Sequence, residues 1–141
     1  MTTKMFTLFD LLDWFEDLLD DRANHHDEWY MLFATEERYV ELNITEHEVW
    51  AGAVTNHNLS ADQHLSEMDV LKLGVLGWVP EEVGSPEPKY VRRWEGNAPT
   101  SQIVAQILRA FTLIYLDPET ELVEVVRGTF ANGNTGWDYG A

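Results

Sequence analysis

The chain has 141 residues and a formal net charge of −16, with 25 acidic side chains against nine basic ones. This length suits one domain with its own core, and an apolar content of 45% is typical of a globular chain rather than a disordered one. The charge repels phosphate backbones and anionic lipids, so we expect neither a nucleic acid nor a membrane as partner. The sequence contains no cysteine, which excludes disulfides and thiol catalysis.

No apolar run approaches the roughly 20 residues that a bilayer-spanning helix needs. The first residues also lack the uninterrupted apolar stretch and small-residue cleavage site of a signal peptide. We therefore expect a cytoplasmic protein.

The first predicted element is an amphipathic helix over residues 5–21. Its apolar residues recur at spacings of three and four and define one face, with aspartates on the other. They are Met5, Leu8, Leu11, Leu12, Phe15, Leu18 and Leu19. Three more aromatic residues, Phe6, Phe9 and Trp14, fall at or beyond the margin of this face. This surplus predicts either packing on two sides or a contact surface, and it is compatible with a homodimer.

Three strands are predicted next, near residues 29–34, 39–44 and 48–54. Apolar and polar residues alternate along the second strand, and the links between the strands are short and polar. Short links predict hairpins, hence an antiparallel meander with one face on the core. We expect the other face and the edge of the sheet to bind a partner, with Tyr39, Trp50 and Val54 contributing.

A second helix is predicted over residues 67–76. Ser66 and Asp69 form a capping box at its start, and Gly77 ends it. A proline-rich loop follows over 79–88, where three prolines exclude a helix or a central strand.

The remaining elements are a short strand over 90–94, a third helix that begins near Pro99 and a final strand over 121–126. We therefore expect one α+β domain over residues 1–127, an antiparallel sheet packed against two or three helices. A Gly- and Asn-rich tail covers residues 128–141, although its aromatic residues are unusual for a pure linker.

Two stretches carry a resemblance to a known family. They are Leu71-x-Leu73-x-x-Leu76-Gly77-Trp78-x-Pro80 and, about ten residues later, Pro88-Lys89-Tyr90-x-Arg92-x-Trp94. Together they resemble the bacterial YbjN-like and TY-Chap domains, relatives of type III secretion chaperones of the CesT class, over roughly residues 5–126. Lys89 stands where the family pattern usually has Asn. The resemblance implies an antiparallel sheet on helices, binding of a peptide or client protein and no catalytic residues; some relatives are described as sensory transduction regulators.

Five residues are candidates for partner binding: Trp50, Trp78, Tyr90, Arg92 and Trp94. Aromatic and arginine side chains are the groups that most often anchor interfaces. The alternative is that Trp78 and Trp94 pack under the proline-rich loop and join the second helix to the sheet.

Four of the nine basic residues gather in one stretch: Lys89, Arg92, Arg93 and Arg109. The planar guanidinium suits a pocket for a carboxylate or an acidic client segment. The alternative is internal neutralisation by nearby carboxylates.

The run His25-His26-Asp27-Glu28 contains metal-ligand types, but adjacent residues point apart, so we expect a polar connector and no metal site. We find no Gly-rich phosphate loop, Ser elbow or paired His nucleophile, and therefore expect no enzyme and no cofactor. The predicted function is a non-enzymatic, chaperone-like or adaptor module that binds a protein or peptide client. The alternative is a regulatory or structural component of a larger assembly that docks through its C-terminal tail.

Overall fold

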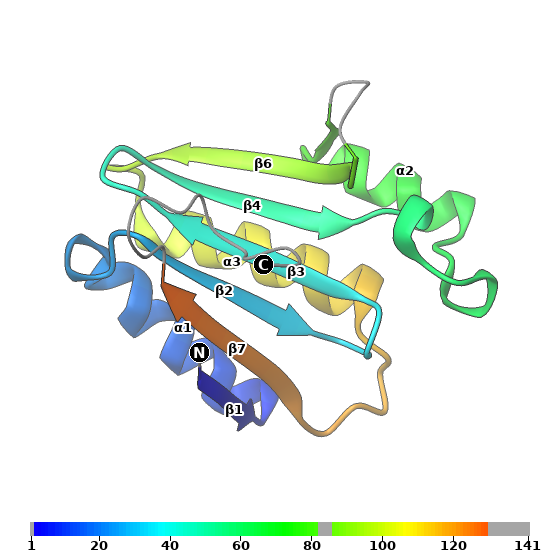
Figure 1. Ribbon diagram of the computed structural model, residues 1–141, viewed down its shortest axis with the longest axis horizontal. Helices are drawn as coiled ribbons and strands as arrows, with labels where there is room; N and C mark the ends of the chain where they lie inside the picture. The colour runs from blue at the N-terminus through cyan, green and yellow to red at the C-terminus, as the bar shows by residue number, and fades with distance from the viewer. Residues whose placement is uncertain (1, 82–85, 130–141) are drawn as a thin grey trace.

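The computed structural model describes residues 2–81 and 86–129. Over these residues the chain forms a seven-stranded antiparallel sheet in the order β1-β7-β2-β3-β4-β6-β5, together with three α-helices. Helices α1 and α3 lie against one face of the sheet, and α2 lies near its β6 side (Figure 1). The predicted α+β class, with an antiparallel sheet on helices, is confirmed.

The strands are β1 (Thr2–Phe6), β2 (Glu28–Phe33), β3 (Tyr39–Ile44), β4 (Glu48–Val54), β5 (Val79–Pro80), β6 (Lys89–Glu95) and β7 (Val123–Thr129). The helices are α1 (Leu8–Asp20), α2 (Glu67–Val75) and α3 (Thr100–Ala110), and single 3-10 turns cover Arg22–Asn24, Asn56–Asn58 and Ala61–Gln63. The β2-β3-β4 meander is as predicted, with Tyr30 opposite Leu42 and Leu42 opposite Ala51. These residues belong to the buried face that packs on the helices.

The prediction of a helix from residue 5 was wrong, because Thr2–Phe6 pairs with β7 as the edge strand β1. Helix α1 starts after Thr7, whose hydroxyl accepts a hydrogen bond from the Asp10 amide at 3.1 Å. Phe6 therefore reaches the core from a strand, and Trp14 packs on it at a ring-centroid distance of 5.2 Å. Phe9 keeps 76% of its surface exposed.

Two further boundaries differ from the predictions. Val79 and Pro80 form a short edge strand on β6, a position where proline costs no ladder hydrogen bond. At the other end, β7 continues through Gly128 to Thr129, two residues into the segment expected to be a tail. The rest of that segment, 130–141, lies outside the described residues.

Helix α3 widens at its end into a π-helical turn over Phe111–Tyr115. The Leu116 amide donates to the Phe111 carbonyl at 2.9 Å, which closes the five-residue repeat. Phe111, Ile114 and Tyr115 are buried there, whereas Leu113 is 61% exposed. The turn thus carries one large apolar side chain out of the core.

The sheet face turned away from α1 and α3 is not a bare surface. The Trp29 and Trp50 rings lie where a Cβ at Gly128 or Gly52 would stand, so each ring lies flat on the sheet. Val54, which we expected to contact a partner on this face, is fully buried. This position therefore gives no support to the predicted partner surface.

Arg22 joins the end of α1 to the segment that leads from β6 into α3. Its guanidinium donates five hydrogen bonds, to the Leu19, Gly96 and Ala98 carbonyls and to the Thr100 hydroxyl. The Gly96 carbonyl accepts two of them, at 3.0 and 2.7 Å. The Arg22 guanidinium therefore links the end of α1 to the segment before α3, although Arg22 and Gly96 are 74 residues apart in the sequence.

We expect Arg22→Lys to lower the free energy of unfolding by about 1–3 kcal/mol, because a single ammonium cannot serve carbonyls on two segments. Urea unfolding measures the change. The matched control is Arg93→Lys, since Arg93 is an exposed arginine of β6, and a surface change of this kind should stay within about 0.5 kcal/mol of wild type. Equal losses in the two variants would contradict the role given to Arg22.

Candidate functional site

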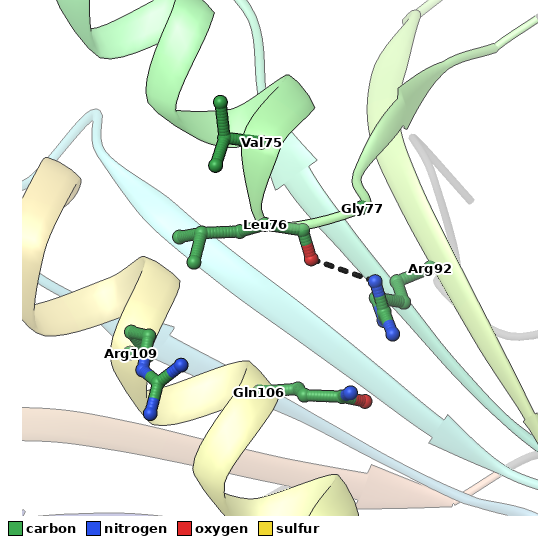
Figure 2. Close-up of a pocket in the computed structure, with 6 residues that line it drawn as sticks. All are labelled: Val75, Leu76, Gly77, Arg92, Gln106 and Arg109. Atoms are coloured by element: carbon green, nitrogen blue, oxygen red, sulfur yellow. Dashed lines mark hydrogen bonds between the residues drawn. The ribbon is translucent and has the colours of Figure 1, made fainter.

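A pocket opens where the end of α2, strand β6 and helix α3 meet. It has a volume of about 300 Å³, and Figure 2 shows the residues that line it. Its lining consists of Val75, Leu76, Gly77, Arg92, Gln106 and Arg109. Two of the nine basic residues of this acidic chain therefore line one cavity.

Gly77 gives the pocket its shape at the end of α2. Its φ of +89° is a left-handed conformation that favours glycine, and it lets the Trp78 amide reach back to the Leu73 carbonyl at 2.9 Å. An added Cβ would lie 1.7 Å from Nη1 of Arg92. The predicted helix-ending glycine is thus confirmed, and it also makes room for a guanidinium.

Arg92 is held on two sides. Its Nη1 donates to the Leu76 carbonyl at 2.6 Å, and its guanidinium carbon lies 5.6 Å from the centre of the Trp94 ring. Its Nε–H is buried and has no hydrogen-bond acceptor among the described residues. One arginine donor at the pocket is therefore shielded from water without a protein partner.

Gln106 is oriented by the same tryptophan. The Trp94 indole N–H donates to Oε1 of Gln106. Because an indole nitrogen can only donate, this contact assigns the amide oxygen and leaves the amide NH₂ as the free end. The side chain thus adds two neutral donors to the pocket (Figure 2).

The four clustered basic residues divide into two groups. Lys89 is buried and forms ion pairs with Glu41 at 3.7 Å and Glu87 at 3.9 Å, as internal neutralisation predicts. Arg92, Arg93 and Arg109 form no ion pair within the described part of the chain, and of these three only Arg92 and Arg109 line the pocket. For these two residues, the carboxylate interpretation therefore remains.

An apolar groove borders the pocket along α2. It has a volume of about 290 Å³ and shares Val75 and Leu76 with the pocket. Its other lining residues are Met68, Leu71, Lys72 and Leu113. The apolar side chains are unusually exposed: 60% for Met68, 63% for Leu71 and 87% for Val75. A further hollow of about 350 Å³ lies beyond Leu71, on the side of Leu65 and Val70.

The five predicted binding residues do not form one surface. Trp78 and Trp94 are buried and meet edge to face at 6.4 Å, as the packing alternative predicts. Tyr90 is half-buried against the core, and burial raises the pKa of its hydroxyl. Trp50 pairs with Arg93 and lies on the opposite face of the sheet, where its ring covers Gly52. Of the five, only Arg92 lines the pocket.

The sequence interpretation missed most of the groove. The signal was present in α2, where Met68, Leu71 and Val75 recur at helical spacing in addition to the buried Leu73. A helix that is apolar on more than one side needs a second covering surface. Gln106 carries no sequence signal, because its role depends on the indole of Trp94.

No protein-family model matches the chain, and neither a curated protein nor a solved structure does. Within the described ranges, no helix is long and apolar enough to cross a membrane.

A second polar cluster surrounds Glu28 at the start of β2. The carboxylate accepts hydrogen bonds from the Tyr30 hydroxyl and from Arg127, and it lies 2.8 Å from Nδ1 of His25. The described residues include no group of three or more His, Asp or Glu side chains placed to hold a metal ion. His25 is instead occupied with Glu28 and, at 3.3 Å, with Asp21.

Burial raises the pKa of Glu28, but the hydrogen bonds from Tyr30, Arg127 and His25 outweigh it, so the net pKa lies below the ordinary 4.5. Because the pKa of Glu28 is lower in the folded than in the unfolded protein, the ionised carboxylate stabilises the fold. This contribution is fully present above pH 4.5 and is lost as the pH falls through the pKa of the folded state. We expect wild type to exceed Glu28→Gln in stability at neutral pH, with the difference shrinking below pH 4.5. Urea unfolding of both proteins across this range checks it; a constant difference would contradict the assignment.

Proposed function

We propose that the chain is a non-enzymatic module that binds an apolar segment of another protein in the groove along α2. The observation that carries the proposal is the exposed stripe formed by Met68, Leu71 and Val75 with Leu113 beside it. Contiguous apolar surface on a soluble protein marks contact sites more often than chance. A chaperone-like or adaptor role, which the resemblance of residues 71–94 implies, accords with such a groove.

Charge favours a foreign segment over a second copy of the chain. Lys72 lines the groove, and Arg92 and Arg109 line the adjoining pocket. A two-fold symmetric contact brings the same patch together from both subunits, so these cations would face one another. A partner segment that combines apolar side chains with a carboxylate complements both parts of the site.

One of the two edges of the sheet is a weaker candidate for self-association. Strand β1 forms that edge and carries the exposed Lys4 at its centre. An antiparallel pairing of two β1 strands centred on Lys4 places the two ammonium groups opposite each other, which destabilises the pair. The groove therefore remains the better supported site.

The test uses an array of synthetic peptides that contain Leu, Ile or Phe at alternating or helical spacing and one Asp each, with labelled protein as the probe. We expect wild type to bind a subset, and Leu71→Asp to weaken binding of that subset by about tenfold or more, because a buried leucine contact is worth about 1.5–3 kcal/mol. Fluorescence anisotropy quantifies each hit.

The matched control is Phe9→Asp, which places the same charge at an exposed apolar residue of α1. This variant should bind like wild type. Failure of wild type to bind any peptide below millimolar concentration would reject the proposal, as would equal losses in both variants. A wild-type dimer that Leu71→Asp dissociates would identify a second copy as the occupant and likewise overturn it.

A further inference from the structure

We infer that the pocket formed by Arg92, Gln106 and Arg109 binds a carboxylate of the partner segment. The inference rests on the proposed peptide-binding function and names the chemical group that fixes the segment beside the groove. The first argument is the composition of the polar lining. Two guanidinium groups and one amide NH₂ offer donors only, and the Leu76 carbonyl is already occupied by Arg92.

The second argument is that a needed acceptor is missing. The Nε–H of Arg92 is buried without an acceptor in the described part of the chain, and the solvent-exposed Arg109 has neither a hydrogen bond nor an ion pair there. Buried donors are normally satisfied, so an unsatisfied one points to a ligand. In a chain with 25 acidic residues, two arginines that line one pocket and pair with none of the described carboxylates leave this pocket open to a carboxylate from another molecule.

The third argument is that two of the donor side chains, Arg92 and Gln106, are held in place before a ligand arrives. The Trp94 ring lies against Arg92, while its N–H holds Gln106. The Leu76 carbonyl fixes the other side of the Arg92 guanidinium. Because these side chains are already ordered, binding costs less conformational entropy than ordering free arginines would.

Charge and position define the ligand further. A net charge of −16 repels polyanions, so a single carboxylate fits better than a phosphate group or an acidic run. Val75 and Leu76 belong to both the pocket and the apolar groove. The ligand therefore carries an aliphatic side chain next to its carboxylate. The carboxylate is either an Asp or Glu side chain or the end of a chain.

The test titrates isotope-labelled protein with N-acetyl-leucine, which carries one carboxylate and one aliphatic side chain. NMR follows the Nε–H of Arg92, the amide of Gln106 and the indole N–H of Trp94. We expect saturable shifts at these groups. N-acetyl-leucinamide, which lacks the charge, should bind at least about tenfold more weakly, as expected when a charge-assisted hydrogen bond is lost. Inorganic phosphate serves as the competing anion.

Three variants connect the shifts to the pocket. Arg109→Gln should weaken N-acetyl-leucine about tenfold or more. Gln106→Glu should abolish binding with the fold intact, because the new carboxylate takes the place of the ligand and still accepts from Trp94. Arg93→Gln, the same charge change one residue along β6 but on the opposite face of the sheet, should leave binding unchanged.

Peptides that bind in the groove assay then show whether the carboxylate belongs to a side chain or to a chain terminus. Comparing Asp with Asn in peptides with an amidated C-terminus tests the side-chain carboxylate. Comparing a free C-terminal acid with its amide tests the chain terminus. Equal binding of N-acetyl-leucine and its amide, no shift at the pocket groups, or shifts with phosphate alone would overturn the inference. If peptides still bind and Leu71→Asp still weakens them, the proposed function stands while the carboxylate site falls.

Discussion

The contact between Arg92 and the Leu76 carbonyl is the interaction on which this corner of the molecule depends. It connects the last turn of α2 to strand β6, and the glycine that follows makes the approach possible. Helix α2 is short, and Leu73 is its single fully buried residue. Its position therefore depends strongly on the hydrogen bond between Arg92 and the Leu76 carbonyl at its end. The orientation of the exposed stripe and the shape of the pocket are therefore set together.

Trp94 has a comparable double role. It is a core residue with 6% of its surface exposed, yet its ring face lies against Arg92 and its indole N–H donates to Gln106. Burial of an aromatic ring thus supplies rigidity to groups that lie at the surface. Trp94 therefore shapes the pocket from the core without lining it.

Much of the fold could be predicted from the sequence, because period-two alternation and short links define the β2-β3-β4 meander, and Ser66, Asp69 and Gly77 define α2. The N-terminal strand could not, since Met5 also continues the apolar spacing of α1 and only the cap at Thr7 separates the strand from the helix. Of the polar residues that line the pocket, Arg92 and Arg109 were predicted from the sequence and Gln106 was not. The cluster of basic residues near residue 92 allowed either a carboxylate pocket or internal neutralisation. Which of its members are ion-paired depends on which carboxylates the fold brings near, as with Lys89 and Glu41. The position of Gln106 depends on a contact across twelve positions.

The wide turn at the end of α3 has a consequence for how such a groove can vary. A π-helical turn contains one residue more than the α-helical turn it replaces. Deleting Thr112 would restore the tighter repeat and move the next residue by about 100° around the helix axis. Leu113, which now borders the groove, would turn elsewhere. A one-codon change in this turn can thus remodel one wall of the groove while the sheet remains as it is.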